Sequence, residues 1–184
     1  MRPLLLPLLI GCSNATAPAE DTWSPETGPT TIDTEPDDTT QTERVVFNEV
    51  LADNEEGETN EFGSHGDWLE LYNNGSTAVD ITGWGLMDGG ASEAWIIDTP
   101  LVLAPGQFLL IWCDEVDDKD ATALHATFKL SRNGEMLTLL DETSERVDSV
   151  EYPGLDVDQA WGRRPDGAGG WDYMVEPTPG ANNL

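Results

Sequence analysis

From about residue 45 onward the chain is a succession of short apolar segments separated by turn residues, and this pattern restricts the fold more than any other feature. The first segment, Val45–Leu51, is apolar and β-branched and is shorter than a typical helix. The segment Asp67–Tyr72 alternates, so that Leu69 and Leu71 point to the same face. The polar and glycine-containing stretch between the two segments indicates a loop. The pattern therefore predicts β-strands.

The rest of the chain repeats this pattern at the spacing expected of a β-sandwich. Phe108–Trp112 is apolar on both faces, which predicts a central strand. The pattern of residues 121–130 does not decide between a helix and a strand, because Leu124 and Phe128 have helical spacing but no clear cap precedes them. No long amphipathic helix is indicated, so we expect an all-β domain. The other segments expected as strands are 78–81, 84–87, 94–97, 107–113, 135–140, 146–150 and 159–162.

Short motifs occur in order along this part of the chain and together resemble the bacterial lamin tail domain. The resemblance implies an immunoglobulin-like β-sandwich, which we place at residues 44–184, after an N-terminal segment whose composition predicts disorder. The family has no agreed catalytic residues to carry over. The motifs are Asn48–Asn54, Asp67–Asn73, Val79–Trp84, Leu103–Gly106, Leu124–Ser131, Val147–Val150, Gly162–Gly167 and Pro177–Gly180.

The N-terminus has the pattern of a lipoprotein signal. Arg2 precedes an apolar run that is too short to span a bilayer, and Leu9–Cys12 resembles the lipobox, in which the cysteine is acylated. We therefore expect residues 1–11 to be a signal peptide and Cys12 to carry the lipid anchor. Residues 12–43 are rich in threonine, proline and acids, which predicts a disordered tether. The resemblance to the lipobox implies that the protein is located in a bacterial cell envelope, at the outer membrane or the cell surface.

The chain is strongly acidic, with 36 acidic and 8 basic residues and a net charge of -28. A field of this sign repels phosphate backbones, because nucleic-acid affinity comes largely from lysine and arginine. We therefore expect no nucleic-acid partner. The negative charge is compatible with binding basic partners or divalent cations. It is also compatible with a surface whose charge only keeps the protein soluble.

Calcium is the cofactor that the sequence leaves open, because Ca²⁺ takes several oxygen ligands and acidic loops supply them. No acidic group here has the register of an EF-hand loop. The acidic group Asp114–Asp120 follows the central strand, and we expect it to be a solvated loop. The candidate calcium ligands surround the first loop and are Glu49, Asp53, Asn54, Asp67 and Glu70.

Catalytic chemistry has little support in the sequence. His65 and His125 are the only histidines, and no nucleophile turn or oxyanion-forming motif accompanies them. Cys113 ends an apolar strand, so a buried thiol is expected. We expect no catalytic residue and no resident cofactor. Trp68 and Trp84 are candidate ligand-binding residues, although such tryptophans more often belong to the core of a sandwich.

These features lead us to expect a membrane-anchored, surface-displayed, non-catalytic binding, adhesion or scaffold module. Its expected partner is another envelope protein, a matrix polymer or a basic surface. The alternative is a calcium-dependent accessory domain that binds the substrate of a separate secreted hydrolase.

Overall fold

The computed structural model describes residues 45–117 and 121–183, and these residues form strands and turns without any helix. The prediction of an all-β fold is therefore confirmed. Accordingly, this part of the chain holds no helix long and apolar enough to cross a membrane. The predicted signal peptide, Cys12 and the predicted tether lie outside the described residues.

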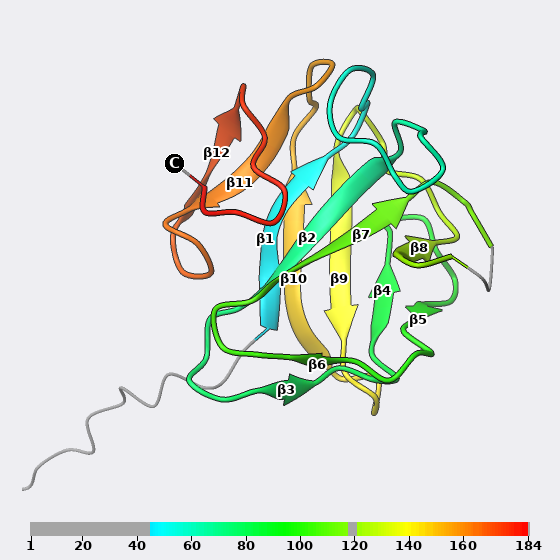
Figure 1. Ribbon diagram of the computed structural model, residues 1–184, viewed down its shortest axis with the longest axis vertical. Coiled ribbons are helices and arrows are strands. Elements are labelled where there is room, and N and C mark those ends of the chain that lie inside the picture. Colours follow the sequence, from blue (N-terminus) through cyan, green and yellow to red (C-terminus); the bar gives the residue numbers. More distant parts are fainter. Residues whose placement is uncertain (1–44, 118–120, 184) are drawn as a thin grey trace, which may run out of the picture. The chain divides into compact units, whose positions relative to one another are not determined.

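A six-stranded sheet forms one layer of the fold (Figure 1). Neighbouring strands are antiparallel except β7 and β8, which run parallel. β1 pairs with β2 on one side and with β11 on the other, so the start and the end of the domain meet in this sheet. In order across the sheet, the strands are β12 (Gly170–Met174), β11 (Ala160–Arg164), β1 (Val45–Leu51), β2 (Asp67–Asn73), β7 (Phe108–Cys113) and β8 (Leu124–Ala126).

A four-stranded antiparallel sheet forms the second layer, and its strand β10 packs against β1 (Figure 1). Two short strands form a separate ribbon. The four-stranded sheet contains β10 (Arg146–Tyr152), β9 (Glu135–Leu140), β4 (Gly85–Met87) and β5 (Trp95–Ile96), and the ribbon contains β3 (Val79–Asp80) and β6 (Val102–Leu103). The two layers agree with the immunoglobulin-like sandwich that the resemblance implies.

Most strands lie where the apolar pattern places them, and the differences have local causes. β7 lies between β2 and β8, which confirms the central strand. Within the ambiguous stretch, residues Leu124–Ala126 form a strand because their backbone pairs with Ile111–Cys113. β6 and β12 were not predicted: β6 has two residues, and β12 is held by its backbone pairing with β11.

The main hydrophobic core lies between the two sheets. Leu69 and Leu71 are fully buried there, as their alternation predicts. Each large apolar side chain buried in this way contributes roughly 1.5–3 kcal/mol. Other members from the two sheets are Val45, Phe47, Val50, Ile111, Leu86, Leu137, Leu139 and Val150.

A second, smaller cluster lies on the outer face of the six-stranded sheet. Its members alternate along their strands with residues of the main core, so they point away from the second sheet. The C-terminal segment, residues 175–183, crosses this outer face beside β1 and β11 (Figure 1). It thereby helps to bury a face that the sandwich leaves open. The cluster contains Leu51, Trp68, Trp112, Ala160 and Met174.

A buried ion pair joins the two sheets. Asp148 of β10 accepts the backbone N–H of Phe47 at 3.0 Å and lies 3.4 Å from Arg163 Nη2. Arg163 also donates from Nε to the Phe47 carbonyl at 2.8 Å. Both β1 and β10 have a register shift next to these residues. The pair therefore satisfies backbone groups that the irregular pairing leaves open.

Candidate functional site

The structure divides the five candidate calcium ligands into two groups. Glu49 and Glu70 are cross-strand partners on the outer face of the six-stranded sheet. Asp53, Asn54 and Asp67 lie beyond the end of β1 and at the start of β2. The set therefore does not surround one point.

The first group is part of an acidic clasp, which we define as Asn48, Glu49, Glu70 and Asp166. Glu49 and Glu70 are both 0% exposed. The Asn48 amide donates to Glu70 Oε1 and to Asp166 Oδ1, each at 3.0 Å. The amide of Asn183 in turn donates to the Asn48 carbonyl at 3.3 Å. The clasp is therefore a closed network of hydrogen bonds.

The clasp holds the C-terminal segment. Glu49 accepts the backbone N–H of Thr178 at 3.1 Å and its hydroxyl at 3.1 Å. Glu70 accepts the backbone N–H of Gly180 at 2.6 Å. These carboxyl groups bind a segment of their own chain, and this use explains why two glutamates are buried side by side.

Burial raises the pKa of Glu49 to about 7, against the lowering effect of its hydrogen bonds from Thr178. Burial likewise raises the pKa of Glu70 to about 7, against hydrogen bonds from Gly180 and Asn48. The nearby Glu49 carboxyl adds to the rise at Glu70 by like-charge repulsion. Near neutral pH both groups are therefore substantially protonated.

The second group shapes the first loop. Asp67 Oδ1 accepts the backbone N–H groups of Asp53 at 2.8 Å and Asn54 at 3.2 Å. The Asn54 amide donates to the carbonyls of Glu58 and Gly66, each at 2.8 Å. Burial raises the pKa of Asp67, against the lowering effect of hydrogen bonds from Asn54 and Asp53. These polar atoms are engaged in building the loop.

The structure does not bring these five predicted calcium ligands together at one point. Side-chain oxygens of Glu49, Asn54, Asp67 and Glu70 accept hydrogen bonds from the chain, and Asp53 Oδ2 lies 2.8 Å from Arg132 Nη1. Across residues 45–117 and 121–183, no group of three or more histidine, cysteine, aspartate or glutamate side chains is placed to hold a metal ion.

Trp68 and Trp84, the candidate ligand-binding tryptophans, lie in two different hydrophobic clusters. Trp68 is 0% exposed and belongs to the outer cluster, while Trp84 is 7% exposed and belongs to the main core. Both rings are used for packing, which is the usual fate of large aromatic side chains in a sandwich.

The sequence missed a second polar network, the histidine clip, which we define as Glu61, Asp114 and His125. His125 Nδ1 lies 2.9 Å from Asp114 Oδ1, and its Nε2 lies 3.0 Å from Glu61 Oε2. Glu61 Oε1 also accepts the backbone N–H groups of Thr122 at 2.8 Å and Ala123 at 2.9 Å. The clip joins the first loop to β8.

Interactions between His125 and the two carboxyl groups outweigh burial in setting the pKa values of the clip. Burial alone lowers the pKa of His125, but hydrogen bonds to Asp114 and Glu61 outweigh it and raise the pKa. Burial raises the pKa of Glu61, but hydrogen bonds from the backbone and from His125 outweigh it and lower the pKa to about 2. With a carboxylate on each ring nitrogen, His125 has no nitrogen left to take a proton from a nucleophile.

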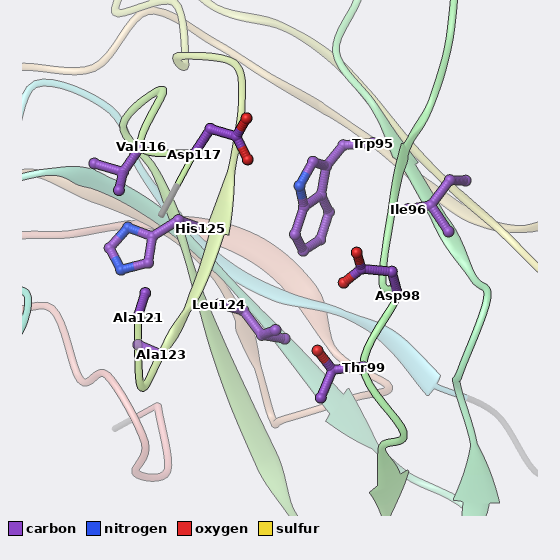
Figure 2. Close-up of a pocket in the computed structure, with 10 residues that line it drawn as sticks. All are labelled: Trp95, Ile96, Asp98, Thr99, Val116, Asp117, Ala121, Ala123, Leu124 and His125. Atoms are coloured by element: carbon purple, nitrogen blue, oxygen red, sulfur yellow. The ribbon is translucent and has the colours of Figure 1, made fainter. Parts of the chain in front are cut away.

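A small cavity of about 100 Å³ lies between His125 and the edge of the second sheet (Figure 2). Figure 2 shows Trp95 and Asp98 on one side of it and His125 and Asp117 on the other. Its volume is well below the roughly 300–1,000 Å³ of typical small-molecule sites. The cavity therefore does not suit an ordinary substrate.

Cys113 is fully buried, and burial raises the pKa of its thiol. A buried thiol of this kind is a poor nucleophile, because the thiolate is the reactive form. The residue is therefore part of the core, as its position at the end of an apolar strand predicts.

An aromatic surface, which we define as Trp161, Trp171 and Tyr173, covers β11 and β12 on the side opposite the outer cluster. Trp161 pairs with Tyr173 across the two strands, with ring centroids 4.8 Å apart. The Trp161 and Trp171 rings are nearly parallel at 6.4 Å. Arg163 lies 4.7 Å from the centre of the Trp171 ring, and this cation–π contact fixes the ring's position.

This aromatic surface is partly exposed. Tyr173 is 46% exposed, and both tryptophans are half-buried. Two shallow hollows adjoin Tyr173: one of about 320 Å³ beside Gln159, and one of about 370 Å³ beside Trp161 and the end of β10. The sequence contained the signal, because residues 161 and 163 and residues 171 and 173 have the spacing that places side chains on one face of a strand.

The comparisons with known proteins identify one family. The family described as Lamin Tail Domain matches residues 38–154. No curated protein matches the chain. The matched stretch ends after β10, so β11, β12 and the C-terminal segment lie beyond it.

Proposed function

Because the chain belongs to the lamin tail domain family, we propose that it is a surface-displayed binding module without catalytic activity of its own, held at a bacterial cell envelope by an acylated Cys12. The aromatic surface on β11 and β12 is the observation that carries this proposal. Its partner is a matrix polymer or another envelope protein.

The anchor is supported by the lipobox-like Leu9–Cys12 and by the threonine- and proline-rich stretch that separates Cys12 from β1. Metabolic labelling with a palmitate analogue tests it. We expect label on the wild-type chain and none on Cys12→Ala. Unlabelled wild type, or label that survives the substitution, rules the anchor out.

The aromatic surface supports binding because it presents three partly exposed aromatic rings next to one another. Such rings bury a large area at little cost in side-chain entropy, which is why they are enriched where proteins bind partners. The two hollows that adjoin Tyr173 give a chain-like ligand room to continue past the rings. A polysaccharide, whose sugar rings have apolar faces and hydroxyl edges, fits this chemistry.

Binding to insoluble polymers tests the role of this surface. Wild type and the double variant Trp171→Ala/Tyr173→Ala are mixed with cell-wall sacculi, chitin and cellulose, and the bound fraction is measured after sedimentation. We expect at least one polymer to bind wild type about tenfold more tightly than the variant. Phe62→Ala is the matched control, because Phe62 is 51% exposed and lies outside β11 and β12. Equal binding of wild type and the double variant to every polymer contradicts polymer recognition by this surface.

A second candidate function is an accessory domain that brings a separate hydrolase to its polymer. The hollows beside Tyr173 favour it, because a flat adhesive surface does not need them. Fusing the domain to a polysaccharide hydrolase distinguishes the two functions. An accessory domain increases the hydrolysis of the insoluble polymer, and this gain disappears in the Trp171→Ala/Tyr173→Ala fusion, whereas an adhesion module leaves the rate unchanged.

A further inference from the structure

The C-terminal segment, residues 175–183, exposes most of its side chains and is attached to the outer face through hydrogen bonds. Val175 is 82% exposed, and Asn183 is the only residue of the segment that is buried. The acidic clasp accepts the backbone N–H groups of Thr178 and Gly180. The state of the clasp therefore decides how firmly the segment is attached.

The hydroxyl of Thr178 faces two oxygen atoms but has only one hydrogen. Its Oγ1 lies 2.7 Å from Asn183 Oδ1 and 3.1 Å from Glu49 Oε2. The Asn183 amide nitrogen donates to the carbonyls of Arg163 at 2.9 Å and Asn48 at 3.3 Å, so Asn183 Oδ1 is left as an acceptor. An ionised carboxylate also only accepts. Both contacts are satisfied together when Glu49 carries a proton and donates it to Thr178 Oγ1.

The charges around Glu49 favour the same protonated form. Burial raises the pKa of Glu49 to about 7, and among its charged neighbours Asp166 raises the pKa further, while Arg164 lowers it by less. Glu70, its cross-strand partner, is also fully buried. Across residues 45–117 and 121–183, the ionisable residues that surround Glu49 on this part of the outer face are Glu70 of β2, Arg164 of β11, Asp166 in the turn after β11, Asp172 of β12 and Glu176 of the segment. All of them except Arg164 are acids.

We propose that the acidic clasp attaches residues 175–183 in a proton-dependent way: the segment is held while Glu49 and Glu70 carry at least one proton between them, and it is released when both are ionised. Two carboxylates side by side in a place without water repel each other strongly, because little screens their charges. Release of the segment lets water reach both carboxylates and removes this cost.

Burial sets the direction of the pH effect. While the segment is attached, burial raises the pKa of Glu49 and that of Glu70 to about 7, against an ordinary value of 4.5 for a glutamate in water. The attached form therefore binds more protons between these two values. Attachment is firmest below pH 4.5 and weakens as the pH rises through 7. One proton changes the equilibrium about tenfold per pH unit over this range.

This attachment goes beyond the proposed function and does not depend on it. The rings of the aromatic surface point to the other face of β11 and β12, and none of them belongs to the clasp. Release of the segment instead changes the outer cluster. Leu51 and Trp68 of this cluster line the same hollow as Pro177 and Pro179 of the segment, so release uncovers this apolar face.

Hydrogen exchange of the Thr178 and Gly180 amides, measured by nuclear magnetic resonance on the full chain with Cys12→Ala, tests the proposal. Rates are corrected for the intrinsic pH dependence of exchange, and a chelator in every sample keeps metal ions out of the comparison. We expect the protection of both amides to fall about a hundredfold from pH 5 to pH 8 and to stay below that of the β1 and β2 amides. Constant or rising protection overturns the proposal. Protection equal to that of β1 and β2 at every pH also overturns it, because the segment would then open only with the whole domain.

Glu49→Gln should keep the segment attached at every pH. Its side-chain amide offers an acceptor to the Thr178 N–H and a donor to Thr178 Oγ1, and it cannot ionise. We expect the protection of Thr178 in this variant to change by less than about tenfold over the same pH range. Glu176→Gln is the matched control, because it removes one exposed charge from the same segment, and it should follow wild type within about twofold. An equal pH response in Glu49→Gln and wild type contradicts the proposal.

Thr178→Val is a second variant that carries little risk to the fold, because residue 178 is only half-buried. It keeps the backbone N–H and the volume of the side chain but removes the oxygen that accepts the Glu49 proton. We expect the protection of the residue 178 amide at pH 5 to fall about tenfold, which corresponds to the loss of one hydrogen bond. Unchanged protection at pH 5 would show that no proton is held between Glu49 and residue 178.

Discussion

The acidic clasp and the histidine clip each use carboxyl groups to hold distant parts of the chain, yet their pKa values move in opposite directions. In the clasp, burial raises the pKa of Glu49 and Glu70 to about 7. In the clip, backbone donors and His125 outweigh burial and lower the pKa of Glu61 to about 2. The residue type is the same, and the surroundings decide its charge.

The difference lies in what replaces water around the carboxyl group. Glu49 and Glu70 are removed from solvent and receive mostly neutral donors, which do not offset the cost of burying charge. Glu61 receives two backbone N–H groups and a histidine whose charged form it favours. A buried acid with neutral partners thus tends to be protonated, and an acid with a cationic partner tends to be charged.

The largest expected effect comes from removing a clasp carboxyl. Glu70→Ala removes the acceptor of the Gly180 backbone N–H and of one N–H of the Asn48 amide, and both donors are then buried without a partner. The substitution also creates a cavity. We expect the free energy of unfolding at pH 6 to fall by about 4 kcal/mol. Glu61→Ala should cost about 1 kcal/mol, because water can reach the donors it frees. Urea denaturation of both variants measures this, and a larger loss in Glu61→Ala would contradict the comparison.

The next effect is the pH dependence of stability. Because the folded-state pKa of Glu70 is about 7 and its ordinary value is 4.5, the folded protein binds more protons between these values. This contribution to stability is present below pH 4.5 and is lost as the pH rises through 7. A rise of that size corresponds to roughly 3 kcal/mol.

Glu70→Gln cannot ionise, so its free energy of unfolding should decline less than that of wild type between pH 5 and pH 8. Urea denaturation at intervals across this range measures the decline. Equal slopes for the two proteins would show that Glu70 is not the source, and a wild-type stability that rises over the range would reverse the predicted sign.

A smaller effect concerns the clip. The raised pKa of His125 contributes stability that is present below pH 6.5 and is lost as the pH rises through the folded-state value. The lowered pKa of Glu61 contributes stability that is present above pH 4.5 and is lost as the pH falls toward 2. Both contributions are complete between pH 4.5 and 6.5.

We expect Glu61→Gln to lower the pKa of His125, because the variant loses the carboxylate on Nε2. The pH titration of the His125 ring signals measures this pKa. An unchanged titration midpoint would show that Glu61 does not affect the protonation of His125.

The smallest effect should come from an exposed pair that neither network includes. Lys129 and Glu115 lie 3.4 Å apart, with 64% and 60% of their side-chain surfaces exposed. Lys129→Ala should change the free energy of unfolding by less than about 0.5 kcal/mol, because solvent screens such pairs. Thermal melting in low and high salt checks this, and a loss comparable to that of Glu70→Ala would show that burial does not govern the ranking.

The strands were predictable because their pattern is local. The alternation in Asp67–Tyr72 places Leu69 and Leu71 in the core, and the two-sided apolar run in β7 marks a strand between two others. β12 was not predicted, although Trp171 and Tyr173 alternate with Gly170 and Asp172, because the alternation covers only five residues and the strand is held by its pairing with β11. The surroundings of the candidate ligands could not be predicted for a related reason: Glu49 and Glu70 meet, but they also hold Thr178 and Gly180, which lie more than a hundred residues away.

The sequence by itself determined the all-β fold, the faces of its main strands and the buried position of Cys113, because period-two alternation specifies which side chains leave water. The tertiary structure alone decided the pKa of the carboxyl groups and the contact of Glu49 and Glu70 with the C-terminal segment. The pKa of a carboxyl group depends on which distant backbone approaches it, and sheet order sets that approach. Local composition does not contain this information.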